Sequence, residues 1–216
     1  QVAWPKSLEL MALLRFKLAG YNIGVIRNPK CASTSTISYI LQACGVKFDK
    51  NGELPNYTKF TNLLGKDSYI GRRKPFNNYE KELLECDFRI AVWRNPIEKL
   101  SSGYAHCIAH QFIKETSLDM FLENYNVICK KSNVNVWDHC SPNSTHLGTD
   151  KRIFTHIYNH KEVDTHLLPM LRVWSGNPII KQHMRPGNKA TQISPSNEQI
   201  EKMKSLMEID YKVGWN

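Results

Sequence analysis

The stretch Tyr21–Ala43, which reads YNIGVIRNPKCASTSTISYILQA, decides the fold class of this chain. Its first part, Tyr21–Arg27, is a short apolar run with the length of a buried strand. The run ends at Asn28-Pro29, where proline cannot donate to a central ladder. Over Ser33–Ala43, apolar residues recur at the i, i+3, i+4 spacing of one helix face. The stretch therefore predicts a strand, a tight loop and a helix.

The same order returns later in the chain. Phe88–Trp93 (FRIAVW) is a second apolar strand candidate, closed by Asn95-Pro96, and a helical pattern runs from Ile97 to Phe112. This alternation predicts an α/β fold, with a P-loop-like central parallel β-sheet flanked by helices in a single domain over residues 1–216. Ligands bind such sheets at the carboxyl ends of the strands, which is where both basic loops fall.

Patterns elsewhere are less regular. Ser7–Leu18 has leucines at helical spacing and predicts an amphipathic helix, and Leu118–Cys129 predicts another. Val134–Thr149 is rich in Asn, Ser, Pro and Gly and predicts a loop. Ser196–Tyr211 predicts a late helix with Ser196 as its N-cap.

Composition narrows the class of protein. Of 216 residues, 41% are hydrophobic and 23% charged, which excludes a disordered or fibrous chain. No apolar run approaches the roughly 18 to 20 residues of a transmembrane helix, so we expect no transmembrane segment in this chain. Lys and Arg total 29 against 20 Asp and Glu, a net charge of 29 − 20 = +9. This excess suggests an anionic partner: a nucleic acid, a phosphorylated cofactor or an acidic glycan.

The six cysteines form no C-x-x-C pair. A loose group of Cys129, His139, Cys140 and His146 has no standard zinc spacing, so we expect no metal. In a secreted protein, a disulfide between Cys129 and Cys140 is the expected special role of the cysteines.

The loop between the first strand and its helix has the composition of an anion site. Small residues let the backbone wrap an anion, and free N–H groups at the following helix start face it. Lys30 adds a mobile positive charge, and the hydroxyls add donors. The alternative is a Ser/Thr-rich helix cap, and the order is not that of a nucleotide-triphosphatase loop. The candidate phosphate-binding residues are Pro29, Lys30, Cys31, Ala32, Ser33, Thr34, Ser35 and Thr36.

A second basic motif, Arg94–Tyr104 (RNPIEKLSSGY), follows the second strand. The planar guanidinium of Arg94 can grip a phosphate with two hydrogen bonds. Ser102 lies eight residues on, about two helical turns, and its hydroxyl can reach the same group. The alternative is an arginine that forms a salt bridge to a neighbouring helix.

Together the two motifs resemble those of the carbohydrate sulfotransferases (sulfotransferase family 2), the family of heparan sulfate 2-O-sulfotransferase. The family's P-K-x-x-S-T-[ST] stands here as PKCASTS, and its R-D-P-x-x-R-x-x-S-x-Y as RNPIEKLSSGY. The family's D-x-H-x-x-P-Q resembles Asp164–Met170 (DTHLLPM) more weakly, and its closing helix resembles Glu208–Trp215 (EIDYKVGW).

This chain departs from the family at several positions. Asn95 replaces the usual Asp, Lys99 replaces the usual Arg, and Met170 replaces Gln. Around Tyr69–Arg72, where the 2-O-sulfotransferases carry their histidine base, the chain has no histidine.

The resemblance implies a donor, 3′-phosphoadenosine 5′-phosphosulfate (PAPS), with adenosine 3′,5′-bisphosphate as product and no metal. Lys30 would stabilise charge on the bridging oxygen as the phosphate leaves. The loop amides and the hydroxyls of Ser33, Thr34 and Ser35 would hold the 5′-phosphate. Arg94 and Ser102 would hold the 3′-phosphate.

A base must also take the proton of the acceptor hydroxyl, which suits a neutral histidine. The first candidate is His166, with Asp164 near it in sequence, and the second is His106. A carboxylate from residues 49–87 is the third. Arg185 and Lys189 are candidates for closing over the nucleotide.

The resemblance implies an acceptor with a hydroxyl, by default a glycan. The unassigned basic run Arg72-Arg73-Lys74 suggests that the glycan is acidic. Two other functions are open. A P-loop kinase would need a Mg²⁺ carboxylate at a strand end, where Arg94-Asn95 stand instead. A nucleic-acid binder would interleave aromatic and basic residues, and no clear interleaving is present, so we expect no nucleic-acid partner. We expect a cytoplasmic protein if the chain is complete and a Golgi-lumen protein if it is a trimmed catalytic domain.

Overall fold

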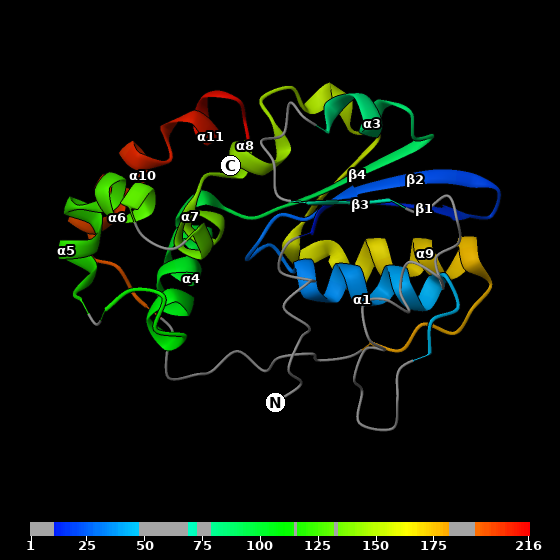
Figure 1. The fold of residues 1–216 in the computed structure, drawn as a ribbon, viewed down its shortest axis with the longest axis horizontal. Helices are drawn as coiled ribbons and strands as arrows, with labels where there is room; N and C mark the ends of the chain where they lie inside the picture. The colour runs from blue at the N-terminus through cyan, green and yellow to red at the C-terminus, as the bar shows by residue number, and fades with distance from the viewer. Residues whose placement is uncertain (1–10, 48–68, 73–78, 115, 132–133, 182–192) are drawn as a thin grey trace. The chain divides into compact units, whose positions relative to one another are not determined.

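The computed structural model describes residues 11–47, 69–72, 79–114, 116–131, 134–181 and 193–216 (Figure 1). The described residues group into two compact units. The first takes its members from residues 1–28, 32–93 and 146–185, and the second from residues 29–31, 94–145 and 186–216. The single domain expected over 1–216 stays a prediction.

A five-stranded sheet forms the centre of the first unit, in the order β3-β1-β2-β4-β5. Strands β2, β4 and β5 are parallel neighbours, and β1 is antiparallel to both β2 and β3, so four strands run in one direction. The α/β class with a mostly parallel open sheet is therefore confirmed, while the P-loop-like details stay a prediction. The bounds are β1 Met11–Leu18, β2 Tyr21–Ile26, β3 Tyr69–Arg72, β4 Phe88–Trp93 and β5 His156–Asn159.

The predicted helix over Ser7–Leu18 is wrong, because Met11–Leu18 is strand β1. The leucine spacing fits a helix, but the stretch also alternates with period 2: Phe16 is buried and Lys17 is exposed. Ala19 and Gly20 both have positive φ, at 52° and 85°. They form the two-residue turn that hairpins favour, so β1 folds back onto β2.

Helices lie on both faces of this sheet (Figure 1). Helices α1 (Ser33–Ala43) and α9 (Leu168–Ser175) lie on one side, and the short α3 (Glu80–Leu84) lies on the other. Before α9 the chain makes 3₁₀ turns at Lys151–Ile153 and His160–Glu162 and a π-helical turn at Val163–Leu167.

The second unit is helical, with α4 as its longest helix. Its other helices pack around a core that includes Leu100, Phe121, Val136 and Met203, all fully buried. The helix predicted over Leu118–Cys129 is broken at Asn124. The bounds are α4 Pro96–Ala109, α5 Leu118–Glu123, α6 Tyr125–Lys131, α7 Val134–Cys140, α10 Asn197–Leu206 and α11 Glu208–Lys212.

Ser196 caps α10 as predicted, since its Oγ accepts from the Gln199 amide at 3.2 Å. The loop predicted over Val134–Thr149 is wrong, because α7 and α8 (Asn143–Leu147) occupy it. The cause is tertiary: Val136 is buried in the core, and a carboxylate from α11 accepts hydrogen bonds at the start of α8.

Among the described residues, no helix has both the length and the apolar character needed to cross a membrane.

Candidate functional site

The segments that follow β2 and β4 begin at the same edge of the sheet. These strands are parallel neighbours, with Ile23 opposite Phe88 and Val25 opposite Ile90. Just after β2, Asn28 Nδ2 donates to the carbonyl of Val92 at 3.1 Å, which ties the start of the first loop to the end of β4. The two strands therefore end together, as the sequence predicts.

The loop Pro29–Thr36 has an unusual backbone. Lys30 and Ala32 both lie in the left-handed region, with φ of 64° and 53°, although neither is glycine. Each such residue costs on the order of 1 kcal/mol, and strain of this kind concentrates at ligand-binding turns. The chain passes from the second unit to the first between Cys31 and Ala32. Alternation of backbone handedness turns successive N–H groups toward one side, as in anion-binding nests.

Helix α1 starts at this loop without a side-chain cap. Ala32 is its N-cap residue, and none of the described side chains caps this end. The first backbone hydrogen bond of the helix runs from the Thr36 amide to the Ala32 carbonyl, at 2.9 Å. The amides of the first turn, including Ser33 and Ser35, precede that bond, and such amides attract anions.

The loop side chains divide into two groups by burial. Pro29, Cys31 and Thr36 are buried, whereas the remaining members, Lys30 and Ala32–Ser35, are half-buried. Cys31 Sγ donates to Asn143 Oδ1 at 3.5 Å, and burial raises the pKa of its thiol to about 12. The Thr36 hydroxyl is buried with no hydrogen-bond partner among the described groups. Cys31 can therefore offer a ligand its backbone but not a thiolate.

Arg94 lies against this loop. Its Nη1 donates to the backbone carbonyl of Lys30 at 3.2 Å, and its Nε pairs with Glu98 at 3.3 Å, one turn into α4. The structure thus brings together the two basic residues that the sequence singles out. The salt bridge expected under the alternative is present too, but to Glu98 of the helix that Arg94 precedes.

The start of α4 explains one departure from the family motif. Asn95 Oδ1 accepts from the amides of Ile97 at 3.0 Å and Glu98 at 3.3 Å, and Pro96 occupies the first helical position. Asn and Asp are both strong N-caps. Asn95 therefore performs the capping that an Asp would perform.

A buried hydrogen-bond network, which the sequence analysis did not predict, supports the backbone at Arg94. Asn143 Nδ2 donates to the Arg94 carbonyl at 2.8 Å and to Asp210 Oδ2 at 3.0 Å. Asp210 also accepts from the amides of Asn143 at 2.6 Å and Ser144 at 2.8 Å. Both Asn143 and Asp210 are fully buried. The family-like closing stretch, which contains Asp210, thereby supports the chain on either side of Arg94.

The two further α4 residues of the motif differ in burial. Ser102 is half-buried. Lys99 is 1% exposed and donates to the carbonyl of Ser141, and burial lowers its pKa. The cation that replaces the family's arginine is therefore an interior group in this chain.

The first base candidate, His166, is an exposed residue of the π-helical turn. Its Nδ1 lies 3.0 Å from Thr165 Oγ1. Asp164 is engaged by other groups: it accepts from Tyr39 OH at 2.8 Å and pairs with Lys181 at 2.6 Å. Burial, and then the hydrogen bond to Asp164, raise the pKa of Tyr39. The contacts of Asp164 thus include Tyr39 and Lys181.

The second base candidate, His106, lies in a group of rings. Its ring centroid is 4.2 Å from that of His110 and 4.4 Å from that of His139, which it stacks on. It lies ten residues after Pro96, about 15 Å along α4 from the helix start. This position does not bring His106 to the Arg94 end of the helix.

Some predictions lie on residues that the structure does not describe. These are three carboxylates of residues 49–87 (Asp49, Glu53 and Asp67), the run Arg73-Lys74, and the closing candidates Arg185 and Lys189. His166, His106 and these groups all stay predictions as bases or ligands.

The cysteines form no disulfide: all six are free thiols. The disulfide between Cys129 and Cys140 that we expect in a secreted protein is therefore not formed in this structure. Across the described residues, no group of three or more His, Cys, Asp or Glu side chains is placed to hold a metal ion.

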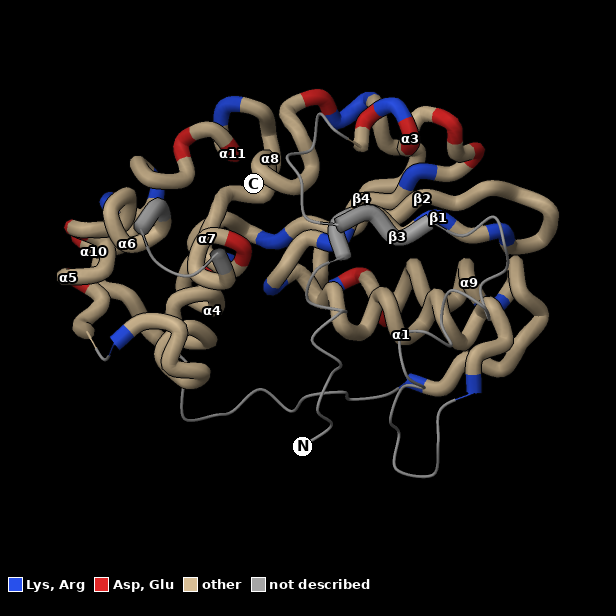
Figure 2. Tube along the Cα trace, viewed as in Figure 1, with Lys and Arg blue, Asp and Glu red and all other residues tan. Residues whose placement is uncertain are grey.

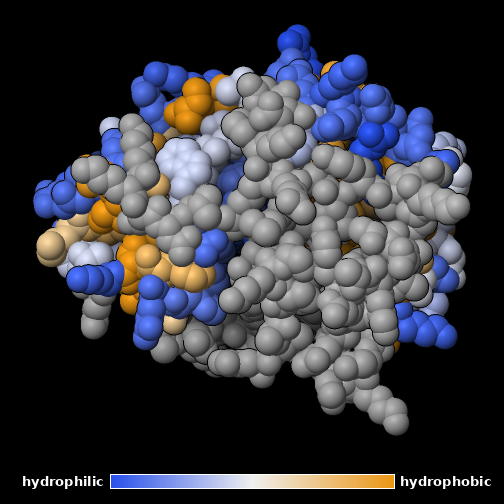
Figure 3. Space-filling model, in the orientation of Figure 1, coloured by the Kyte–Doolittle hydropathy of each residue, from blue (hydrophilic) through white to orange (hydrophobic). Residues whose placement is uncertain are grey.

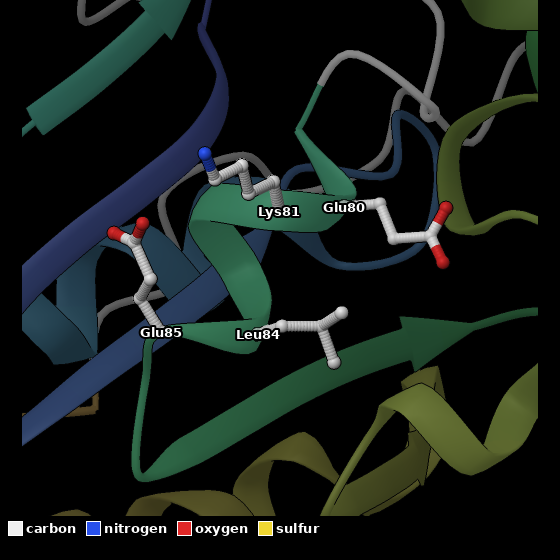
Figure 4. Close-up of a pocket in the computed structure, with 4 residues that line it drawn as sticks. All are labelled: Glu80, Lys81, Leu84 and Glu85. Atoms are coloured by element: carbon white, nitrogen blue, oxygen red, sulfur yellow. The ribbon is translucent and has the colours of Figure 1, made fainter.

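A shallow surface pocket surrounds α3, lined by Glu80, Lys81, Leu84 and Glu85 (Figure 4). Its walls come from α3 and the residue that follows it, and it includes no residue of the two phosphate motifs. Figure 2 shows acidic and basic positions alternating on α3, and Figure 3 shows hydrophilic side chains over it. We read it as a solvated surface.

When the chain is compared with models of protein families, with curated proteins and with solved structures, nothing matches, so the resemblance to the sulfotransferases rests on its motifs alone.

Proposed function

We propose that this protein is a sulfotransferase that moves a sulfuryl group from PAPS to a hydroxyl, by preference that of a carbohydrate. The observation that carries the proposal is the contact of Arg94 Nη1 with the Lys30 carbonyl at 3.2 Å. It joins the two motifs, 64 residues apart, that the family uses for the two phosphate groups of one nucleotide.

The 5′ end of the nucleotide is assigned to the first loop. The strained backbone at Lys30 and Ala32 and the uncapped start of α1 supply amides for a phosphate. The half-buried hydroxyls of Ser33, Thr34 and Ser35 add donors. Sulfuryl transfer resembles phosphoryl transfer, where catalysis is mostly positioning and charge stabilisation. In this role Lys30 stabilises the charge that develops on the bridging oxygen.

The 3′-phosphate is assigned to Arg94 and Ser102. The Arg94 side chain is 24% exposed, and its guanidinium is oriented by Glu98 and by the Lys30 carbonyl. A phosphate held there gains charge-assisted hydrogen bonds. His166 and His106 remain proposed bases, and the acceptor is a glycan of either neutral or acidic type.

The test is a calorimetric titration with adenosine 3′,5′-bisphosphate, with adenosine 5′-monophosphate, and with ATP plus Mg²⁺. We expect the bisphosphate to bind most tightly, because it alone presents both 5′- and 3′-phosphates. Tighter binding of ATP with Mg²⁺ would refute the sulfotransferase assignment in favour of a phosphotransferase. Transfer from ³⁵S-labelled PAPS to a panel of neutral and acidic glycans then tests the activity and ranks the acceptors.

A further inference from the structure

Helices α4 and α7 approach each other very closely at one point of the second unit. A Cβ atom on Gly103 would collide with the carbonyl oxygen of His139 and would lie 3.1 Å from Cys140 Sγ. Only glycine permits this approach, because any side chain would collide with backbone. The end of α7 is therefore held directly against the surface of α4.

Residues one turn to either side of Gly103 extend the contact. Lys99, one turn before it, donates to the carbonyl of Ser141. Cys107, one turn after it on the same helix face, brings its Sγ to 3.9 Å from Cys140 Sγ. Both cysteines are fully buried. Three successive turns of α4 thus fix the end of α7, and the two sulfur atoms face each other within that contact.

The sulfur separation is within reach of a covalent bond. A disulfide needs about 2.05 Å between sulfur atoms, so the two must approach by about 2 Å in total. Rotation about the Cα–Cβ bond of either cysteine moves its sulfur atom by a distance of that order. We infer that Cys107 and Cys140 form an intramolecular disulfide when the chain folds in contact with a disulfide oxidant, either glutathione disulfide or a protein that carries an oxidised dithiol.

The chemistry balances as two successive thiol–disulfide exchanges. A thiolate of one cysteine attacks a sulfur of the oxidant, forms a mixed disulfide and expels one thiolate. The second cysteine loses its proton to solvent and attacks the protein sulfur of the mixed disulfide. The Cys107–Cys140 bond forms, the second oxidant thiol leaves, and two protein thiols have been oxidised while one oxidant disulfide has been reduced.

Burial sets when this exchange occurs. The hydrogen bond with Cys107 and burial both raise the pKa of Cys140, so thiolate is scarce once the helices have packed. The attack therefore takes place during folding, before α7 covers α4, or through local opening. Cys129 is the competing partner: it is 4% exposed in α6, and Tyr125 from the same helix donates to the Cys140 carbonyl at 3.0 Å. The geometry favours Cys107, whose sulfur is already in contact.

The experiment is oxidative refolding of the full chain. Reduced, unfolded protein is refolded with reduced and oxidised glutathione, unfolded again, alkylated, digested and mapped without reduction. We expect a peptide linked through Cys107 and Cys140 and four alkylated cysteines of the six. Six alkylated cysteines, or a link between Cys129 and Cys140, would overturn the inference.

The melting temperature tests whether Cys107 and Cys140 are covalently linked or are only close together. A disulfide across 33 residues constrains the unfolded chain, so a reductant should lower the melting temperature of the oxidised protein by about 10 °C. Cys129→Ala and Cys44→Ala should keep both the linked peptide and this sensitivity, while Cys107→Ala should lose both. If Cys107→Ala does not fold, the peptide maps of wild type and Cys129→Ala decide. None of these readouts requires PAPS binding, so the result is independent of the proposed function.

Discussion

The chain after β2 and the chain after β4 both begin with the same three residues, Arg-Asn-Pro, at the same sheet edge. After β4, the helix starts at once: Pro96 is its first residue and Asn95 caps it. After β2, three residues intervene between Pro29 and α1, and two of them, Lys30 and Ala32, are left-handed. The three additional residues 30–32 thus accompany a helix start that has no side-chain cap, whereas α4 has one.

The difference separates two ways of recognising an anion. At α4 the Asn95 side chain uses two of the first amides, so the proposed anion ligand is a side chain, Arg94. At α1 none of the described side chains takes that place, so the backbone itself is left to bind. Asn28 is the counterpart of Asn95, but its side-chain amide donates to the Val92 carbonyl.

The largest effect should come from removing Lys30, the positive charge in the loop before α1. Lys30→Ala should lower the rate of sulfuryl transfer about 1,000-fold, since removing one group that stabilises transition-state charge costs about 100- to 1,000-fold or more. Binding of the bisphosphate should fall far less, because the loop amides remain. Lys47→Ala is the matched control: Lys47 is exposed beyond the other end of α1. Equal losses in the two variants would remove Lys30 from the mechanism.

Arg94→Ala tests the side-chain half of the comparison. Loss of a charge-assisted contact should weaken the bisphosphate about 100-fold while leaving adenosine 5′-monophosphate nearly unchanged. Titration calorimetry with both nucleotides measures the ratio. Arg152→Ala, which removes an arginine whose side chain is 91% exposed, should change neither affinity. An equal loss of affinity for both nucleotides would mean that Arg94 supports the loop and does not bind the 3′-phosphate.

Asn143 touches both regions, and its removal should cost stability. It donates to the Arg94 carbonyl and accepts from Cys31, so Asn143→Ala leaves the Arg94 carbonyl without this donor. Asp210 loses one of its hydrogen bonds and keeps those from the amides of residues 143 and 144. Unpaired buried groups of this kind cost about 2 to 3 kcal/mol of unfolding free energy, measured by urea denaturation. Asn124→Ala, at an exposed asparagine, should cost no more than about 0.5 kcal/mol. A similar cost at both positions would show that the network is not holding the chain.

The parts of this structure that follow local rules could be predicted from sequence. The strand ends at Asn28-Pro29 and Asn95-Pro96, the bounds of α1 and the Ser196 cap all depend on neighbours within a few residues. Proximity of the two basic loops followed from the rule that parallel strands end at one edge.

The parts of the structure that depend on contacts between distant residues could not be predicted from sequence. Helix α8 starts where Asp210, 67 residues away, accepts from the Asn143 amide. The leucines of β1 fit a helix and a strand equally, and the Ala19-Gly20 turn decides between them. Neither Cys107 as the neighbour of Cys140 nor the partners of Asp164 could be read from spacing, because both depend on which helices pack together.

Asn95 provides a smaller test of the capped helix start. Asn95→Ala should lower the free energy of unfolding by about 1 kcal/mol, since two helix amides lose their acceptor. Asn95→Asp, the residue usual in the resembling family, should retain that stability because its carboxylate caps equally well and favours the helix dipole. If Asn95→Asp were as unstable as Asn95→Ala, the cap would need the amide nitrogen, and the geometric reading of this position would fail.

The smallest effect concerns the strain of the open helix start. Ala32 holds φ of 53° with a side chain, so Ala32→Gly should stabilise the protein by about 0.5 to 1 kcal/mol. Gly176 supplies the mirror experiment: it has φ of 64° after α9, and a Cβ there meets nothing within 4 Å. Gly176→Ala should therefore lower the free energy of unfolding by about as much as Ala32→Gly raises it, about 0.5 to 1 kcal/mol. Urea denaturation measures both changes. If the bisphosphate also binds Ala32→Gly more weakly, the strain at Ala32 serves to preform the anion loop; unchanged affinity would assign it to the chain path alone.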